Sequence, residues 1–277
     1  MPALALVLAV TILGTLPATA GDDGKGKELT VYAAASLTGA FGEIGELYQI
    51  ETGEEVIQNF DGSQMLRTQL ENGAYADVYA SANEKHMQAL MSQGLMDNST
   101  VRVLLHNMMA VIVPGDNPGE IGELGDLARP GLKIVVGNRE VPVGAYARQV
   151  LDNLAADPSY GEEFRAKVEE NGVSEETTVN LVVSKVALGE ADAGFAYVSD
   201  VLPPMRSQIE VMEIPEEYNV VADYYIGVLK GSEHPERAAG FIDYVMSEEG
   251  GAVLARYGFT PAGTYPRANA PQAAALA

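Results

Sequence analysis

Hydrophobic positions near the start of the chain change their spacing at one serine. Residues 30–35, TVYAAA, form a short apolar run that is typical of a buried strand. From Leu37 to about Ile50, hydrophobic residues recur every three or four positions, which predicts an amphipathic helix. Ser36 stands between the two patterns, where a helix N-cap belongs. We therefore expect a strand that runs directly into a helix, whose first N–H groups form a seat for an anion.

Strand-like apolar runs continue to alternate with helix-like periodic segments through the first third of the chain. Apolar runs at 55–60 and 77–82 predict two further strands, and the periodic segments behind them predict helices. Strands that alternate with helices in this way form a parallel sheet with right-handed crossovers. Open sheets of this kind bind ligands at the carboxyl ends of their strands, and Ser36 and Ser63 both fall there.

A second series of strands and helices follows a loop rich in glycine and proline. A strand at 109–113 precedes this loop. The strands of the second series are predicted at 132–136, 193–197 and 224–229, and its helices from Ala145, over 178–188 and over 235–257. One α/β architecture is therefore used twice, before about 110 and after about 130. The tail, residues 264–277, contains proline and alanine without a packing pattern, so we expect it to be disordered.

Charge and residue usage exclude several classes of function. The 277 residues include 39 acidic and 17 basic ones, a net charge of −22, so neither nucleic acid nor anionic lipid is an expected partner. The chain has no cysteine, which excludes disulfides, thiolate metal sites and cysteine nucleophiles. Its histidines, His86, His106 and His234, are not at metal-ligand spacing. We therefore expect no cofactor.

The N-terminal residues indicate export from the cytoplasm. Residues 2–20 form the one long apolar run, and Ala18-Thr19-Ala20 fits the small-x-small rule for signal cleavage. A basic segment before the run is missing, and a membrane anchor is the alternative. Gly14 and Pro17 interrupt the run, which favours a signal peptide at 1–20. We expect an exported, periplasmic or extracytoplasmic protein, tethered to the membrane if this segment stays uncleaved.

Five segments occur in the order found in one protein family. They are AAASLTGAF, FDGSQMLRTQLENGAYADVYASANEKHM, VPVGAYARQVL, GEADAGFAYVSD and LARYGFTP. Over residues 29–262 the chain resembles periplasmic molybdate-binding proteins, the substrate-binding subunits of molybdate ABC importers. The resemblance implies an α/β, two-lobed periplasmic-binding-protein fold of type II, with a mainly parallel sheet and flanking helices in each lobe. Two crossing strands would join lobe 1, at 28–109 plus 223–263, to lobe 2, at 110–222.

The resemblance also implies a set of ligand-binding residues. Ser36 and Ser63 match the family's serine ligands, and Tyr197 matches a tyrosine hydroxyl donor. Val143 and Val179 match backbone N–H donors. The metal is then held as its oxyanion by these residues. Hydroxyls, N–H groups and helix N-termini can hold a dianion without a full positive charge.

Each of these side chains has an ordinary explanation when it is taken alone. Ser36 is then better explained as the cap of its own helix, Ser63 as a turn serine and Tyr197 as a partly buried strand tyrosine. Only the set at strand ends, within a full-length resemblance, favours the ligand interpretation. The chain also departs from the family, with Asp61-Gly62 before the second serine and Val143 where alanine is usual. We expect Asp61 to close an Asx-turn and to face away from the anion.

An enzyme, a binding protein for another anion and a sensor domain are alternatives to this interpretation. A secreted serine hydrolase lacks support, because there is no G-x-S-x-G motif and no histidine near either serine in sequence. A binding protein for sulfate or phosphate and the sensor domain of a regulator are further alternatives. We expect a monomeric binding protein, not an enzyme, that captures molybdate, and also tungstate, and delivers it to an ABC-transporter permease.

Overall fold

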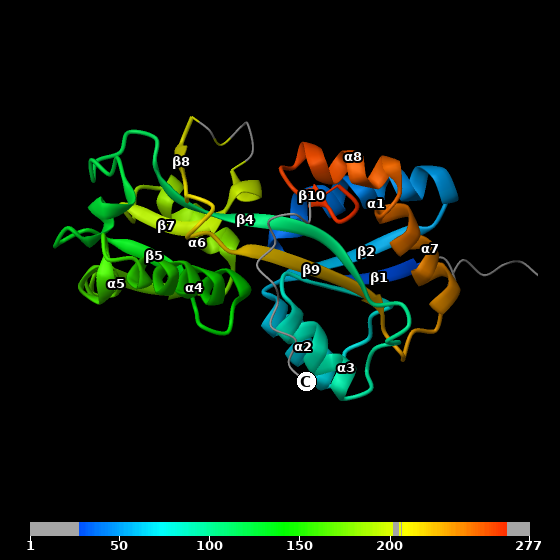
Figure 1. The fold of residues 1–277 in the computed structure, drawn as a ribbon. Helices are drawn as coiled ribbons and strands as arrows, with labels where there is room; N and C mark the ends of the chain where they lie inside the picture. The colour runs from blue at the N-terminus through cyan, green and yellow to red at the C-terminus, as the bar shows by residue number, and fades with distance from the viewer. Residues whose placement is uncertain (1–27, 202–204, 206, 265–277) are drawn as a thin grey trace, which may run out of the picture.

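The computed structural model describes residues 28–201, 205 and 207–264. The expected signal peptide at 1–20 and nearly all of the expected disordered tail lie outside the described residues. Within the described part of the chain, no helix is long and apolar enough to cross a membrane. Figure 1 shows two lobes side by side, with β4 and β9 running between them.

Lobe 1 is built around a sheet in the order β2-β1-β3-β9-β4. The strands are β1 (Glu28–Ala34), β2 (Glu55–Asp61), β3 (Val78–Ser81), β4 (Arg102–Pro114), β9 (Val221–Val228) and the short β10 (Thr260–Pro261). Its helices are α1 (Thr38–Thr52), α2 (Ser63–Glu71), α3 (Glu84–Ser92), α7 (Pro235–Val245) and α8 (Glu248–Arg256). β1 is parallel to β2 and β3, whereas β9 is antiparallel to both of its neighbours.

Lobe 2 repeats the plan with a sheet in the order β4-β7-β5-β6. Besides β4, its strands are β5 (Ile134–Gly137), β6 (Gly172–Glu176), β7 (Ala193–Tyr197) and β8 (Ile209–Glu213), which pairs with β4. Its helices are α4 (Pro142–Ala156), α5 (Gly161–Glu170) and α6 (Val179–Ala187), and short 3-10 turns are η1 (Ala35–Leu37), η2 (Leu124–Ala128) and η3 (Val198–Asp200). β5 is parallel to β6 and β7.

The strand β4 serves both lobes. Its first half, Arg102–Met108, pairs with β9, and its second half, Met109–Ile112, pairs with β7. The α/β fold with two crossing strands is therefore confirmed. Each sheet is mixed, because three parallel strands are joined to the antiparallel strands that pass between the lobes.

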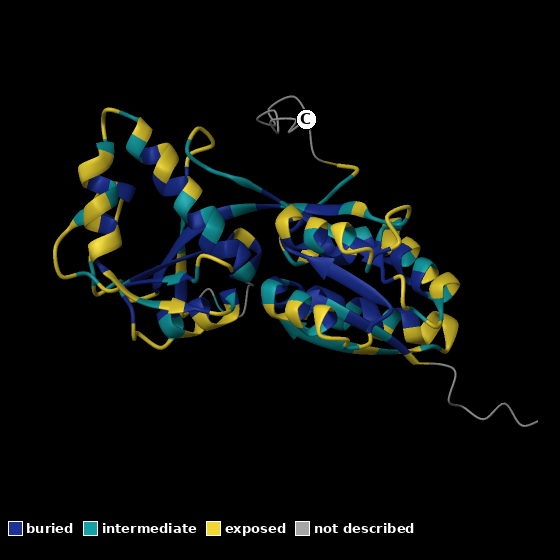
Figure 2. Cartoon of the chain, turned by 90° about the horizontal axis from the view of Figure 1, so that it is seen from below, coloured by how far each residue is buried: buried dark blue, intermediate teal, exposed yellow. Residues whose placement is uncertain are grey.

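Burial follows from the helices that cover these sheets. All four residues of β3 are buried, as is the whole of β7, since helices lie on both faces. Figure 2 shows the dark strands between helices whose outer faces are exposed. The parallel strands of both lobes thus end inside a rigid frame, and their carboxyl ends face the junction between the lobes.

Candidate anion-binding site

A small cavity lies between the lobes. Its lining residues are Ala34, Ala35, Ser36, Gly62, Ser63, Ala82, Val141, Pro142, Val143, Thr178, Val179 and Tyr197. All of the residues predicted for the ligand site are among them: Ser36, Ser63, Val143, Val179 and Tyr197. The fold therefore brings together segments that are more than a hundred residues apart in the sequence.

The size and the charge of the cavity restrict its ligand. Its volume is about 20 Å³, whereas a pocket for an organic ligand is usually about 300–1,000 Å³. No lining residue is charged. The described residues contain no cluster of acidic and histidine side chains that could hold a metal ion. A larger cavity of about 370 Å³ lies in lobe 2 between α4, α5 and β6 and includes none of the predicted site residues.

Three helices begin at the cavity. Ser63 is the first residue of α2, Val143 is the second residue of α4, and Val179 is the first residue of α6. The first N–H groups of a helix have no partner within the helix and carry the positive end of its dipole. The cavity is therefore lined by backbone donors from both lobes.

The start of α4 is held against the end of β5. A Cβ atom on Gly144 would meet the carbonyl oxygens of Gly137 and Asn138, so only glycine fits there. Arg148 fixes the same junction, since its Nη1 donates to the carbonyls of Gly137 (3.0 Å) and Gly144 (2.8 Å). Burial lowers the pKa of Arg148, although an arginine stays protonated in any case. These contacts fix the position of the neighbouring Val143.

The hydroxyl of Ser63 is oriented by the backbone of β3. Ser63 is buried, and its Oγ accepts a hydrogen bond from the N–H of Ala82 at 3.0 Å. The hydroxyl proton is therefore left for a different acceptor. Since Ser63 and Ala82 both line the cavity, that proton can be donated to a ligand there.

The hydroxyl of Ser36 is oriented by a chain of side chains. Its Oγ lies 2.8 Å from the hydroxyl of Tyr224, which lies 3.4 Å from Nδ2 of Asn107. Asn107 Oδ1 accepts from the N–H of Met108, so the amide NH₂ group is the one that faces Tyr224. Tyr224 therefore accepts from Asn107, and its own proton is available for Ser36 Oγ. When Tyr224 donates to Ser36, the proton of Ser36 can be donated into the cavity.

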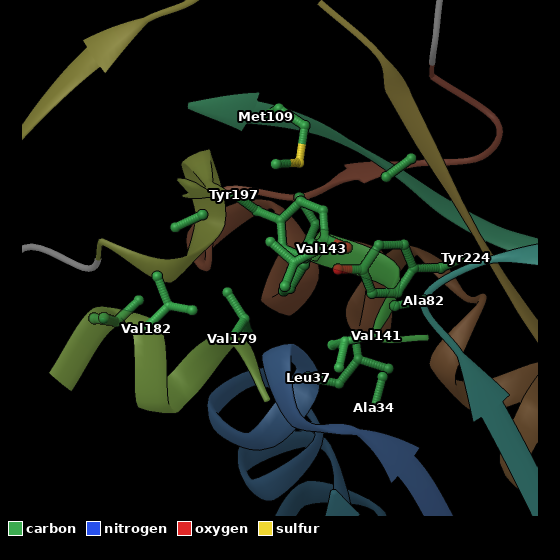
Figure 3. Packing of buried hydrophobic residues seen from close by; sticks show 14 of the residues in the cluster. Ala34, Leu37, Ala82, Met109, Val141, Val143, Val179, Val182, Tyr197 and Tyr224 are labelled. Carbon is green, nitrogen blue, oxygen red and sulfur yellow. The ribbon is translucent and has the colours of Figure 1, made fainter. Parts of the chain in front are cut away.

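Tyr197 supplies a buried hydroxyl. The residue is 1% exposed, and its oxygen makes no hydrogen bond of normal geometry among the described residues, although the side chain of Tyr224 interacts with it. Burial raises the pKa of Tyr197 well above its ordinary value, so the hydroxyl keeps its proton. Leaving such a group unpaired costs about 1–3 kcal/mol. Figure 3 shows the ring between Val143 and Tyr224, at the meeting point of the lobes.

The prediction that Ser36 is a helix N-cap is wrong. Ser36 lies in the 3-10 turn η1, and α1 begins only at Thr38 without a side-chain cap. Thr38 Oγ1 bonds to the carbonyl of Ala35 instead, at 2.6 Å. The extra turn removes Ser36 from the capping position and allows its hydroxyl to reach Tyr224.

Asp61 does not line the cavity. Its Oδ1 accepts a hydrogen bond from the N–H of Gly62 at 2.7 Å, the next residue in the chain. An Asx-turn would use the N–H two residues on, so the expected type of turn is absent, although the carboxylate is engaged outside the cavity.

Tyr224 and Asn107 support the candidate site, and the sequence did not indicate them. Tyr224 lies on β9 and Asn107 on β4, the strands that run between the lobes. Tyr224 was predicted to lie in a strand, but no local pattern marks its hydroxyl as a partner of a serine 188 residues away. The pairing follows only from the order of strands in the sheet.

Known proteins resemble this chain over almost all of its described length. A family model for bacterial extracellular solute-binding proteins matches residues 29–260. The chain is 36% identical to the molybdate-binding protein ModA of Mycobacterium tuberculosis, over 87% of this chain and 87% of that protein. It is 31% identical to a solved substrate-binding domain of a putative molybdenum ABC transporter from Clostridium difficile, with a TM-score of 0.64 over 84% of this chain and 98% of that one.

A second solved structure supports the fold. The periplasmic molybdate-binding protein of Azotobacter vinelandii has a TM-score of 0.72 at 23% identity, and the match covers 84% of this chain and 98% of that one. The fold of this chain is therefore shared with that of a periplasmic molybdate-binding protein.

Proposed function

Because the chain belongs to the family of bacterial extracellular solute-binding proteins, we propose that it captures molybdate outside the cytoplasm and delivers it to an ABC-transporter permease. Support comes from its similarity to the molybdate-binding protein of Mycobacterium tuberculosis and to the Clostridium difficile domain. The observation that carries the proposal is an uncharged cavity at which hydroxyl protons and helix N-termini from both lobes converge.

In this proposal the ligand is held by hydrogen-bond donors alone. Ser36, Ser63 and Tyr197 donate their hydroxyl protons, and Val143 and Val179 donate backbone N–H groups. Ser63 and the backbone donors are already held by their own neighbours, so little reorganisation of these groups accompanies binding. The helix dipoles of α2, α4 and α6 supply partial positive charge in place of a lysine or arginine.

A cavity of donors distinguishes oxyanions by their protons and by their size. A fully deprotonated tetrahedral dianion accepts at every oxygen. Phosphate near neutral pH keeps a proton that needs an acceptor, and burying it unpaired costs about 1–3 kcal/mol. Sulfate has no such proton but is too small to reach all donors at once. Tungstate matches molybdate in shape and charge, so we propose that it binds as well.

Several finer properties belong to the same proposal. The protein acts as a monomer and binds its solute without carrying out a reaction, which fits a family of solute-binding proteins. Residues 1–20 direct its export, and retention of that segment would tether it to the membrane.

Calorimetric titration of residues 21–277 with four oxyanions tests the proposal. We expect saturable binding of molybdate and tungstate, weak binding of sulfate and none of phosphate. Phosphate binding as tight as molybdate binding would contradict the donor-only site, and the absence of molybdate binding would contradict the function. A binding stoichiometry of one ion per chain is expected.

A further inference from the structure

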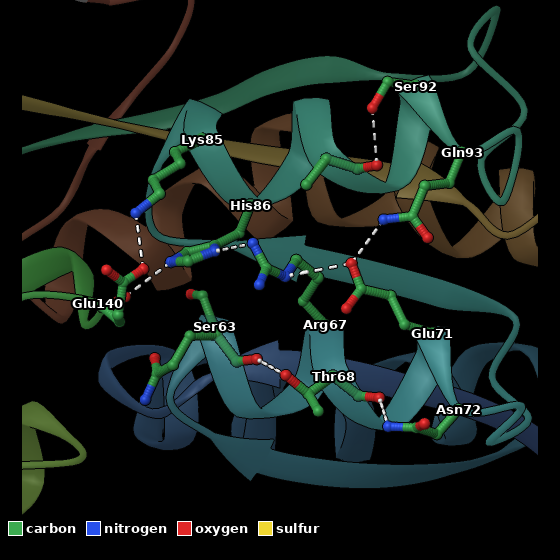
Figure 4. A network of polar contacts seen from close by, with 12 residues as sticks. Ser63, Arg67, Thr68, Glu71, Asn72, Lys85, His86, Ser92, Gln93 and Glu140 are labelled. Atoms are coloured by element: carbon green, nitrogen blue, oxygen red, sulfur yellow. Dashed lines mark hydrogen bonds and ion pairs between the residues drawn. The ribbon is translucent and has the colours of Figure 1, made fainter.

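Polar contacts join the lobes beside the cavity. Nε2 of Gln64 in lobe 1 donates to the carbonyl of Thr177 in lobe 2 at 3.0 Å. On the other side, Nζ of Lys85 lies 2.7 Å from a carboxylate oxygen of Glu140, and Nε2 of His86 lies 2.8 Å from the carbonyl oxygen of Glu140. Figure 4 shows the contacts of Lys85 and His86 together. Lys85 and the Glu140 side chain are exposed, whereas His86 is 0% exposed.

The partners of His86 determine where its proton lies. The carbonyl of Glu140 can only accept, so Nε2 carries the proton and donates to it. Nδ1 lies 3.3 Å from Nη1 of Arg67, which can only donate. Arg67 is itself held by Glu71 on the same helix, at 3.4 Å. A neutral imidazole with its proton on Nε2 satisfies both neighbours, and a protonated one would direct a second N–H at a guanidinium.

Glu140 belongs to the loop that leads into the cavity. The loop is fixed within lobe 2, since Asn138 Oδ1 accepts from the N–H of Glu140 at 3.0 Å and the carbonyl of Asn138 accepts from the N–H of Val141 at 2.9 Å. The residues that follow, Val141, Pro142 and Val143, line the cavity. A hydrogen bond to the Glu140 carbonyl therefore fixes this loop relative to lobe 1.

The other end of the contact is equally close to the site. His86 lies in the first turn of α3, which is capped by Asn83. Immediately before Asn83, Ala82 donates its N–H to the hydroxyl of Ser63. His86 thus connects the lobe 1 segment that orients Ser63 with the lobe 2 loop that presents Val143.

We propose that His86 is a positioning residue that locks the Glu140–Val143 loop of lobe 2 onto lobe 1 and thereby sets how long the anion stays bound. This inference rests on the proposed function. The lock forms only when the lobes are together, because its two halves come from different lobes. It acts through the loop and does not touch the ligand.

The lock also makes anion binding sensitive to pH. The pKa of His86 is lowered to about 4, chiefly by burial and to a smaller extent by the positive charges of Arg67 on α2 and Lys85 on α3, against the opposing effect of Glu140. When the lobes separate, the exposed ring returns towards its ordinary pKa of about 6.5. Closure is therefore fully favoured above that value, and it weakens as the pH falls from about 6.5 towards 4.

Two substitutions separate the hydrogen bond from the titration. His86→Leu removes both, whereas His86→Gln keeps an amide that can donate to Glu140 but does not titrate. At pH 7.5 we expect His86→Leu to weaken molybdate binding about tenfold, chiefly through faster release, and His86→Gln to bind nearly as the unchanged protein does. Lys85→Gln is the matched control, because it removes an exposed ion pair to the same Glu140 and should change Kd less than about threefold.

The pH profile supplies a readout that a structural role alone would not change. Between pH 7.5 and 5.5 the unchanged protein should lose about tenfold in molybdate affinity, whereas His86→Gln should not. Both proteins are compared in phosphate-free buffers of the same ionic strength. His234→Gln, at the start of α7, should keep the loss. Equal pH profiles for the unchanged protein and His86→Gln would overturn the inference.

A measurement on the unchanged protein guards against variants that fail to fold. With saturating molybdate, nitrogen-15 NMR should show His86 protonated on Nε2, with a pKa near 4. A bound-state pKa near 6.5 would overturn the lock while leaving molybdate binding intact. Absence of molybdate binding by the unchanged protein would instead overturn the proposed function and the lock with it.

Discussion

At the scale of the residue, the neighbours of each hydroxyl in the cavity determine whether its oxygen accepts or donates. Ser63 accepts from a backbone N–H, and Ser36 can accept from Tyr224. In this arrangement each serine has its own proton available for a ligand. A site that offers donors and no acceptor selects the ligand by protonation state as well as by shape.

Removal of either serine hydroxyl should weaken binding strongly. A hydrogen bond to a charged group contributes about 1.5–3 kcal/mol, so Ser36→Ala and Ser63→Ala should each weaken molybdate binding by roughly ten- to a hundredfold. Ser92→Ala, at the far end of α3, is the matched control and should have no effect. Isothermal titration measures all three. Unchanged Kd values in both cavity variants, with folding intact, would remove these serines from the site.

Tyr224→Phe tests the orientation of Ser36 without removing a ligand-binding group. The variant should weaken molybdate binding about three- to tenfold, because the Ser36 proton is then free to point elsewhere. In a double-mutant cycle with Ser36→Ala, the two effects should not add, since Tyr224 acts through Ser36. Additive losses would show that Tyr224 acts by a separate route.

The carboxyl group of Asp200 gives a prediction about stability. Asp200 as a whole is half-buried, but its carboxyl group faces inward, and burial raises its pKa to about 7 while it accepts the N–H of Tyr197 at 2.8 Å. Because the pKa is higher in the folded protein than in the unfolded chain, the contribution of Asp200 to stability is greatest at low pH. It falls as the pH rises from about 4 to about 7, where the buried group ionises.

Asp200→Asn should remove this dependence and keep the hydrogen bond, because the amide oxygen accepts equally well. We expect Tm to rise by roughly 2–4 °C at pH 8, about 1 kcal/mol, and to change little at pH 4.5. Thermal unfolding followed by circular dichroism at both pH values measures the difference. A larger gain at pH 4.5 than at pH 8 would contradict the assignment.

At the scale of the element, the helix starts position the ligand-binding groups, and the connections between strand and helix allow little variation. The junction of β5 and α4 illustrates this, since Gly144 touches the carbonyls of Gly137 and Asn138. Gly62 is similarly enclosed, because a Cβ atom there would meet the carbonyl of Thr177 from the opposite lobe. Glycine at these positions allows two backbones to approach beside the cavity.

Gly144→Ala should therefore reduce both stability and binding. Its methyl group must displace the end of β5, which we expect to cost about 1–3 kcal/mol in the free energy of unfolding and at least tenfold in molybdate affinity. Gly42→Ala, on α1, is the control, because no atom lies within 4 Å of the added methyl group. It should stabilise the protein by about 0.5–1 kcal/mol. Urea unfolding and calorimetry measure the two variants.

Elements with a simple hydrophobic pattern were predictable from the sequence. β7 spans Ala193–Tyr197 as predicted, and β2 and β3 differ from their predicted ends by one residue. The first half of β4, Arg102–Met108, was missed because it contains His106 and Asn107 and has an irregularity after Val103. The helix α5 was missed because its segment, GEEFRAKVEE, buries only two side chains, those of Phe164 and Val168.

The candidate site was predictable only in part. Its residues came from a family resemblance, and the fold brings all of them to one cavity. The hydrogen bonds that orient Ser36 could not be predicted, because they depend on β9 lying between β3 and β4 in the sheet. The erroneous N-cap assignment has a similar origin, since a 3-10 turn and an α-helix share the same local signals until the packing of neighbours decides between them.

At the scale of the whole molecule, the contacts between the lobes and the strands that join them describe a closed form. Binding should therefore shift the population of the protein towards this form. Small-angle scattering should show a smaller radius of gyration with saturating molybdate than without it. The profile with molybdate should match that calculated from residues 28–264, and the same comparison with phosphate should show no change. Identical profiles with and without molybdate would exclude closure by a hinge.

If the cavity binds the anion as proposed, the hydrogen bonds of Asn107 and Tyr224 would couple the bending of the molecule to the bound ion. Both residues lie on strands that must flex when the lobes part, and together they direct the proton of Ser36. A force that separates the outer ends of the lobes would therefore lengthen the hydrogen bond from Ser36 to the ion, although no other group enters the cavity. A partner that binds only the outer surface of the lobes could then release the ion without recognising the ion itself.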